Sequence, residues 1–365
     1  CEACRDRKIK CSGTNPCRYC SRRQIPCRFR ENVKKKLYSI EYVVRLEELA
    51  ANRSLSTGQK TRYGITPLKN CGNDQFIELP NLQEAEELLD IVLNSLGNIQ
   101  HLFEPRAFCD RLSEFYSATI DRTDIWYVEL LIVLAIGKLL RGRPDSAGTL
   151  PGMDLYQEAE RHLPGMMSLR REGMTAIEIL SMMAFFLQCA DLREDAYVHA
   201  GMALRLAVAN GMANENSYSG LKRSEQAHRC RLWWTVYMQE RRLSAATGHP
   251  LTIQDSFITT KHPRDAPGFV VPAAMIINIE LAKITGQTMD SKLFSHMIDH
   301  PLTQKVVYGA QNRTLIQHVQ SVQKILKKLQ DVAQLIPSEY TLNLTRAPRL
   351  SRTAGTLYLM LHQAS

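Results

Sequence analysis

Six cysteines near the start of the sequence have the residue type and spacing of a metal site. The spacing C-x2-C-x6-C occurs twice, since CEACRDRKIKC is echoed by CRYCSRRQIPC, and the cysteines are Cys1, Cys4, Cys11, Cys17, Cys20 and Cys27. Tetrahedral zinc takes four sulfur or nitrogen ligands, and no histidine precedes His101. Six thiolates complete two tetrahedra if two sulfurs are shared between the metals. The spacing therefore predicts a cluster of two zinc ions.

A disulfide framework is the main competing interpretation of these cysteines. Six cysteines allow fifteen pairings, and stable pairing needs an oxidising compartment. No export signal is visible, so we expect a reducing compartment. A thioredoxin-like redox role for one C-x-x-C would need a βαβ context that the sequence lacks. Composition and spacing favour zinc.

The positive charge of the sequence is concentrated in the same segment. Residues 1–36, called the basic head below, hold twelve Lys or Arg and three acidic side chains. They account for the whole formal charge of +9, and the rest of the chain is neutral. Two zinc ions on six thiolates would leave the head at about +7, which is ample for phosphate binding. This asymmetry predicts a polyanionic partner.

The cysteine segment resembles the binuclear zinc cluster of fungal six-cysteine transcription factors. The two halves keep their spacing, the basic run RDRKIK fills the first half, and Pro16 stands just before Cys17. The resemblance implies that the first and fourth cysteines, Cys1 and Cys17, bridge the two metals. It also implies that residues 1–30 bind double-stranded DNA and that the protein regulates RNA polymerase II transcription in the nucleus.

The resemblance further implies which side chains read the DNA. A short helix is expected between Cys4 and Cys11, and in the family the end of this helix enters the major groove. The position that reads a CGG-type triplet in the family matches Lys8 here, with Arg7 beside it. Lys or Arg donating to guanine is also the commonest specific contact to a base.

The other basic side chains are expected to contact phosphates, which orient a protein on DNA without specifying sequence. For Arg22, Arg23 and Arg30 a solvated position is an equal alternative. The run at 34–36 also fits a nuclear import signal or a solvated linker. The expected phosphate contacts are Arg5, Lys10, Arg18, Arg22, Arg23, Lys34, Lys35 and Lys36.

Residues 31–53 are expected to form a basic linker and a short coiled-coil helix. Tyr42, Leu46 and Leu49 follow the four-then-three spacing of a dimer seam, and Arg53 takes the next seam position. So short a coil is marginal alone. The family commonly dimerises through such a helix, so we expect a homodimer. Residues 54–75 have no sustained period and are expected to be a flexible linker.

From residue 76 to residue 365 the apolar pattern is helical. Predicted helices cover 82–96, the small-residue stripe from Ala196 to Gly211, and 315–336, where Ile325, Val332 and Leu335 widen the stripe toward a core-facing helix. No strand-like alternation of any length appears, so the predicted fold class is all-α: a small zinc cluster plus a large helical domain. No apolar stretch reaches the roughly 18 residues of a membrane span, so we expect no membrane partner.

A second resemblance concerns AYVHAGMALRLAVANGM and RCRLWWTVYMQERRLSAATGHPLTI. They look like the central motif of the fungal-specific regulatory domain, with Glu240 and His249 where Asp and Arg are usual. The resemblance implies a regulatory role, with a small-molecule effector or a co-regulator as partner. Trp233, Trp234 and Tyr237 fit the lining of an effector pocket, but core aromatics are the favoured interpretation.

Three further expectations concern reactive side chains and the extent of the chain. Cys189 and Cys230 are expected to be buried apolar groups, and His249 a turn residue, because no histidine pair has ligand spacing. The sequence starts on a metal ligand and stops within TLYLMLHQAS, so we expect a C-terminally truncated fragment.

Catalysis is not expected. The sequence has no G-x-G-x-x-G after a strand, no P-loop, no G-x-S-x-G elbow and no zincin motif. An alternative of another class is a zinc-stapled module whose basic head binds RNA or a protein.

Overall fold

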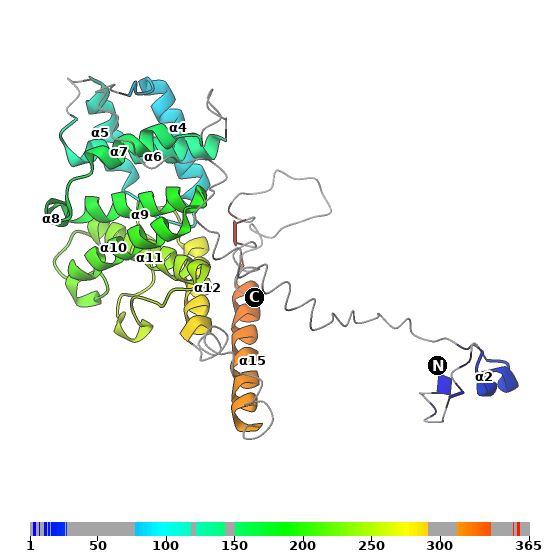
Figure 1. The fold of residues 1–365 in the computed structure, drawn as a ribbon. Helices are drawn as coiled ribbons and strands as arrows, with labels where there is room; N and C mark the ends of the chain where they lie inside the picture. Colours follow the sequence, from blue (N-terminus) through cyan, green and yellow to red (C-terminus); the bar gives the residue numbers. More distant parts are fainter. Residues whose placement is uncertain are drawn as a thin grey trace. The chain divides into compact units, whose positions relative to one another are not determined.

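The structure is a computed structural model that divides into two compact units, Cys1–Arg62 and Tyr63–Ser365. It describes residues 3–4, 7, 11–12, 14, 16–25 and 27 of the first unit and 77–117, 122–142, 150–290, 312–336, 353 and 356–357 of the second. Every regular element in these ranges is a helix, which confirms the all-α prediction (Figure 1). The predicted boundaries at residues 30, 53 and 75 lie outside the described ranges.

The second unit, called the helical body below, packs helix against helix. Its α-helices are α4 (Leu82–Leu96), α5 (Pro105–Ser117), α6 (Ile125–Arg141), α7 (Met153–His162), α8 (Met166–Leu169), α9 (Met174–Cys189), α10 (Arg193–Ala209), α11 (Arg223–Thr247), α12 (Ala273–Asp290) and α15 (Asn312–Gln334). Short 3-10 turns are η1 (Arg170–Glu172), η2 (Glu215–Tyr218) and η3 (Asp255–Phe257). Extensive contacts join α4 to α6, α6 to α7 and α9, α9 to α10, α10 to α11 and α11 to α12.

Helix α6 lies at the centre of one part of the core. Its side chains are buried from Trp126 through Gly137, on every face of the helix. A helix that is apolar all round is a core helix. Gly137 allows α4 to approach closely, since a Cβ there would lie 2.7 Å from Leu88 Cβ.

Helix α4 confirms the prediction for residues 82–96. Asn81 caps its first turn, with Asn81 Oδ1 accepting from the Glu84 N–H at 2.9 Å. Its predicted apolar face is buried at Ala85, Leu88 and Val92, among others. Helix α10 likewise buries the predicted small-residue stripe and ends just before Gly211, whose φ is 74°.

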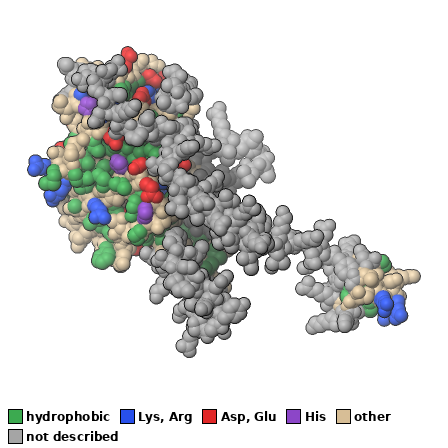
Figure 2. All heavy atoms as spheres, viewed as in Figure 1, with side chains coloured by type: hydrophobic (Ala, Val, Ile, Leu, Met, Phe, Trp, Pro, Cys, Tyr) green, Lys and Arg blue, Asp and Glu red, His purple; other side chains and the backbone are tan. Residues whose placement is uncertain are grey.

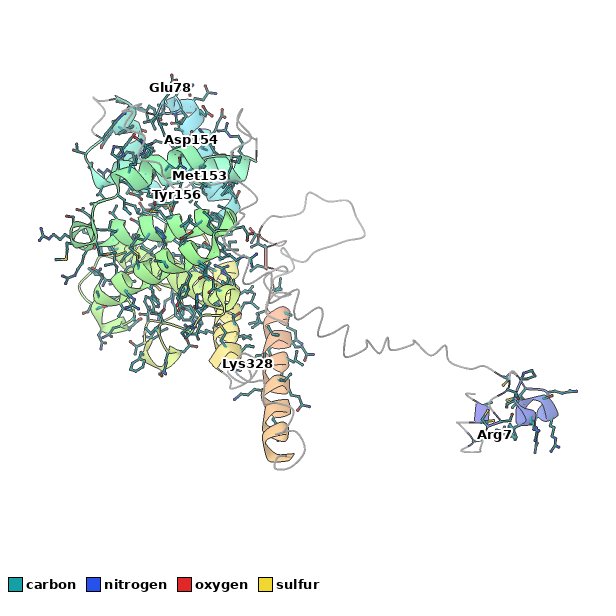
Figure 3. All side chains as sticks on the ribbon, in the orientation of Figure 1. Arg7, Glu78, Met153, Asp154, Tyr156 and Lys328 are labelled. Atoms are coloured by element: carbon teal, nitrogen blue, oxygen red, sulfur yellow. The ribbon has the colours of Figure 1, made fainter. Side chains whose placement is uncertain are left out.

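Helix α15 confirms the predicted C-terminal helix but corrects its buried face. Leu329 and Val332 are buried in a cluster shared with residues of α12. Leu326 and Leu335, both assigned to the core stripe, are 46% and 61% exposed. Lys328, labelled in Figure 3, donates a hydrogen bond to Gln287 of α12. The helical period was predicted correctly, but packing against α12 buries a narrower face of α15 than the predicted apolar stripe.

No single helix in the described part of the chain is long and apolar enough to cross a membrane. One bent pair, Met166–Glu172 with Met174–Cys189, passes by length and composition only, with a bend of 116°.

Candidate metal centre and DNA-binding surface

Cys17 lies at the centre of a cluster of thiols in the basic head. Its Sγ is 3.6 Å from Cys4 Sγ and accepts from the Cys20 backbone N–H at 3.4 Å. The Cys17 backbone N–H in turn donates to Cys27 Sγ at 3.2 Å. The side chain of Cys11 also interacts with those of Cys4 and Cys17. Cys17 thus reaches cysteines of both halves of the duplication, as a shared ligand must.

The donor set fits zinc. The sulfurs of Cys4, Cys17 and Cys20 lie within 4.8 Å of one another and are buried. Cys11 and Cys27 lie at the edge of this group, and none of the described cysteines forms a disulfide. Closely grouped soft sulfur donors suit zinc rather than the oxygen-preferring divalent ions.

The local electrostatics favour a thiolate at the central position. The hydrogen bond from the Cys20 backbone N–H lowers the pKa of Cys17 to about 6. Burial raises the pKa of Cys4 to about 11 and that of Cys20 to about 12. The thiolate is the form that ligates a metal. The backbone therefore prepares Cys17 for ligation, whereas its two neighbours need the charge of a cation to ionise.

Helix α2 (Arg18–Arg23) positions both a ligand and a basic surface. Cys17 is its N-cap, and the helix ends at Gln24 in the left-handed region with a φ of 50°. Arg18, Arg22 and Arg23 are exposed on it, and basic side chains gather on the described part of the head in Figure 2. This helix was not predicted from the sequence. The duplication was the available signal, since a helix near Cys4 implies a counterpart near Cys20.

Arg7 links the two halves of the duplication. It is exposed, and its guanidinium donates to the Tyr19 hydroxyl at 3.0 Å; Arg7 is labelled in Figure 3. Within the helix predicted between Cys4 and Cys11, Cys4 is helical and Arg7 lies in a turn. Several predicted site residues lie outside the described residues, so their roles stay predictions: Cys1, Arg5, Lys8, Lys10, Lys34, Lys35, Lys36, Tyr42, Leu46 and Leu49.

In the helical body the aromatic side chains Trp233, Trp234 and Tyr237 of α11 are core residues, as the favoured interpretation of the sequence predicted. Trp233, Trp234 and Tyr237 are at most 2% exposed. Trp234 and Tyr237 also reach the wall of a cavity of about 720 Å³, which Asp255 and Lys283 line as well. Tyr237 donates to Asp255 Oδ1 at 2.7 Å, so its hydroxyl is already used in the fold.

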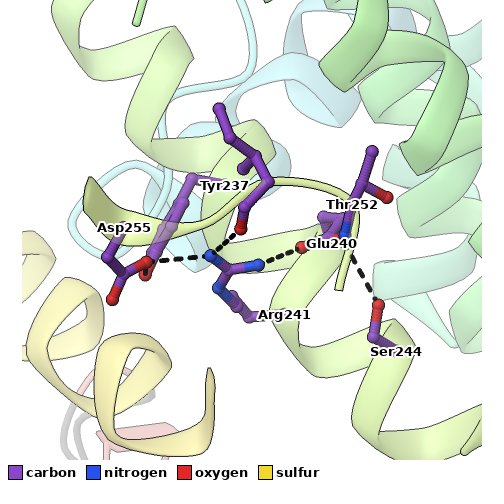
Figure 4. Close-up of polar contacts among 7 residues, drawn as sticks. Tyr237, Glu240, Arg241, Ser244, Thr252 and Asp255 are labelled. Carbon is purple, nitrogen blue, oxygen red and sulfur yellow. Dashed lines mark hydrogen bonds and ion pairs between the residues drawn. The ribbon is translucent and has the colours of Figure 1, made fainter. Parts of the chain in front are cut away.

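The central motif of the body builds a buried polar network at the end of α11 (Figure 4). Arg241 donates to Glu240 Oε2 at 2.9 Å and to Asp255 Oδ1 at 2.8 Å. Glu240 Oε1 accepts from the Thr252 N–H at 2.6 Å and from the Ser244 hydroxyl at 3.3 Å. The network ties the loop after α11 back to the helix. The longer Glu240 side chain makes these contacts where Asp is usual.

Of the three remaining expectations, the one for His249 holds, and those for Cys189 and Cys230 as buried apolar groups need correction. His249 lies in the turn after α11, where its Nε2 is 2.9 Å from Glu194 Oε2. Cys189 is exposed rather than buried, because it ends α9 on the outer side. Cys230 is half-buried and donates to the Lys261 carbonyl at 3.3 Å.

Two family matches cover most of the chain. Residues 1–36 match the fungal Zn(2)-Cys(6) binuclear cluster domain, and residues 84–346 match the fungal specific transcription factor domain. The chain therefore belongs to the fungal-specific transcription factor family, and its N-terminal segment is a zinc-binding cluster domain.

The curated relatives have the same character. An uncharacterized transcriptional regulatory protein of Schizosaccharomyces pombe is 32% identical over 38% of this chain and 18% of its own length. A candidate transcriptional regulatory protein of Saccharomyces cerevisiae is 22% identical over 73% of this chain and 44% of its own length. The thiamine repressible genes regulatory protein of S. pombe is 23% identical over 58% and 29%.

The chain thus spans less than half the length of each of these relatives. No solved structure matches it. The matched families and relatives are transcription regulators rather than enzymes, which confirms the prediction that the chain is not an enzyme.

Proposed function

We propose that this protein is a zinc-dependent, sequence-specific DNA-binding regulator of RNA polymerase II transcription in the nucleus. The observation that carries the proposal is the junction of the thiol cluster with α2. Cys17 contacts cysteines of both halves and caps the helix that presents Arg18, Arg22 and Arg23 to solvent. Metal binding and the orientation of a basic surface are therefore coupled through one residue.

Zinc is proposed to supply the folding free energy of the head. Its fully buried apolar side chains, in the described residues, are Cys4, Cys17 and Cys20, with Ile25 and Tyr19 partly buried against them. So small an apolar core cannot fold a segment of about 30 residues by burial alone. Two ions are proposed, with Cys1 and Cys17 shared between them.

The basic residues are proposed to read DNA at two levels. Exposed arginines of α2 contact phosphates and set the orientation of the head. Lys8, with Arg7 beside it, donates to guanine acceptors of a CGG-type triplet in the major groove. The hydrogen bond from Arg7 to Tyr19 supports this assignment, because it joins Arg7 to α2.

Two further parts of the proposal concern partners. The seam of Tyr42, Leu46 and Leu49 is proposed to pair two chains, so that two triplets are read together. The helical body is proposed to receive a small-molecule effector or a co-regulator.

The test is selection of binding sites from random duplexes by the zinc-loaded chain. CGG-type triplets should be enriched, and Lys8→Ala should abolish that enrichment while keeping salt-sensitive nonspecific binding. Arg22→Ala is the matched control, because loss of a phosphate contact weakens all sequences alike. Unchanged discrimination by Lys8→Ala, or equal competition by unrelated RNA, would refute the proposal.

A further inference from the structure

A small cavity of about 230 Å³ lies in the helical body, apart from the α11 network and the thiol cluster. Its wall comes from α4, the segment 97–105, α11 and the segment 268–270. Most of its lining is apolar and includes Leu93, Leu96, Phe103, Phe269 and Val270. Such a wall suits a small hydrophobic group.

One charged side chain faces this apolar space. Arg231 is 3% exposed, donates to the Arg264 carbonyl at 3.0 Å, and lies 5.2 Å from the centre of the Phe269 ring. Its Nε has no hydrogen-bond partner, and within the described ranges no carboxylate forms an ion pair with it. The charge of Asp265 acts from an exposed side chain at longer range. A buried guanidinium normally has an anion beside it.

The same helix shows how the charge of a buried arginine is compensated within the chain, although the Nε of Arg241, like that of Arg231, has no hydrogen-bond partner. Arg241, ten residues further along α11, forms ion pairs with Glu240 at 2.9 Å and Asp255 at 2.8 Å and donates to the Ile253 carbonyl. Arg231 has the carbonyl contact and the Phe269 ring beside it. Among the described residues it therefore lacks the carboxylates that compensate Arg241.

A second polar group in the cavity wall also lacks a partner. Gln100 is 4% exposed, and its Oε1 makes no hydrogen bond. An amide can turn about its last bond to present either its oxygen or its NH2 group. One buried guanidinium and one buried amide thus line the same small apolar space.

His101, in the cavity wall, leads through His228 to the carboxyl group of Glu178, but this group does not compensate Arg231. His101 Nε2 is 2.8 Å from His228 Nδ1, and His228 Nε2 is 3.3 Å from Glu178 Oε1. Burial lowers the pKa of His228 to about 4 and holds the pKa of Glu178 well above its usual range. His101, His228 and Glu178 therefore interact with one another, and the charge of Arg231 stays uncompensated.

We propose that this cavity binds a small hydrophobic monocarboxylate. Its carboxylate accepts from Arg231 and from the amide of Gln100, and its apolar part packs on Leu93 and Phe103. An engineered cavity of about 150 Å³ in another protein holds benzene, so about 230 Å³ has room for roughly nine non-hydrogen atoms, the size of benzoate. A role of this cavity as an effector site rests on the proposed function. Binding of a carboxylate in the cavity does not, and it is measured separately.

The experiment is calorimetric titration of the zinc-loaded full chain with benzoate and, in parallel, with benzamide. Benzamide has the same shape and size without the charge. Benzoate is expected to bind one per chain and about tenfold or more tighter than benzamide, because its hydrogen bonds are charge-assisted. Equal affinities, or no saturable binding of benzoate at millimolar concentration, would overturn the proposal.

The charge is tested by Arg231→Gln. This variant should lose the preference for benzoate, about tenfold in affinity, and keep its weak affinity for benzamide. Arg205→Gln, at an exposed position of α10, is the matched control and should keep the preference. A persistent preference in folded Arg231→Gln contradicts the assignment.

The cavity itself is tested by Leu93→Trp, which keeps the charge and remains informative if Arg231→Gln does not fold. Leu93 is only partly buried, so a larger side chain is better tolerated there. Loss of benzoate binding supports the site, and retained binding overturns it. Leu326→Trp adds the same bulk at an exposed position of α15 and should bind benzoate normally.

Failure of this proposal is distinguishable from failure of the proposed function. A chain that binds benzoate with the expected preference but no DNA refutes the DNA-binding proposal and supports the cavity site. A chain that binds CGG-containing duplexes but shows equal affinity for benzoate and benzamide overturns the cavity site alone.

Discussion

The basic head and the helical body of this chain are stabilised by different physics. Among the described residues of the head, the buried side chains are three cysteines whose sulfurs lie close to one another. The body has three clusters of buried aliphatic and aromatic side chains spread over α4 to α15. We therefore expect the head to need a metal in order to fold, whereas the body folds by removing apolar surface from water.

The comparison extends to buried polar groups. In the head, Cys17 makes hydrogen bonds and sulfur contacts with cysteines of both halves, and this arrangement suits a cation ligand site. In the body, Arg241 is compensated by carboxylates of the same chain. The thiolate of Cys17 is thus expected to be compensated by a cation, whereas the charge of Arg241 is compensated within the chain.

The largest expected effect follows removal of zinc from the full chain. A strong chelator should abolish DNA binding, and added zinc should restore it. The body should stay folded, and this is measurable because Trp126, Trp233 and Trp234, the three tryptophans of the chain, all lie in it. Tryptophan fluorescence that changes in step with the loss of DNA binding would contradict two independent folding mechanisms.

The next largest effect is expected from breaking the ion pair between Arg241 and Glu240 in the body. Arg241→Met should leave the buried Glu240 unpaired and lower the free energy of unfolding by about 3–5 kcal/mol. Urea unfolding followed by tryptophan fluorescence measures it. Arg205→Met, at an exposed site, should cost less than about 0.5 kcal/mol. Equal stabilities of the two variants would show that the network contributes nothing to the fold.

A smaller effect is the pH dependence of the body. Burial raises the pKa of Glu129 in α6 to about 8, above its ordinary value of 4.5. The folded state thus favours the protonated acid, so this stabilisation is complete below about pH 4.5 and is lost as the pH rises through 8. This group alone should lower the free energy of unfolding by roughly 3 kcal/mol between pH 5 and pH 8.

Glu129→Gln removes the titrating group, so its free energy of unfolding should vary less over the same pH window. Since Glu178 shows a similar shift, some pH dependence should remain in the variant. Because the lowered pKa of His228 acts in the opposite direction, the test is the difference between the two proteins, and equal pH dependences of wild type and Glu129→Gln would contradict the assignment.

The smallest effect concerns one phosphate contact of the head. Arg22→Gln should weaken binding to all duplexes by a similar factor and reduce the slope of log affinity against log salt by about 1. Gel-shift titrations over a range of salt concentrations measure the slope. Arg205→Gln provides the control in the body, and an unchanged slope for Arg22→Gln would mean that this arginine is only solvated.

Local patterns predicted the elements of the body better than the faces that they bury. For α4, the apolar period acts within the helix and was predicted correctly. For α15, the exposure of Leu326 and Leu335 depends on how closely α12 packs, which no local pattern contains. The exposure of Cys189 has a similar cause, because α9 ends where its outer side meets solvent.

The sequence by itself determined that this chain has a cysteine-rich basic head and a neutral all-helical body, because ligand spacing, charge and apolar period are properties of order along the chain. Only the tertiary structure distinguished Arg231 from Arg241. Both are arginines of α11, and their difference comes from groups that the fold brings to them: two carboxylates beside Arg241, and an apolar cavity beside Arg231.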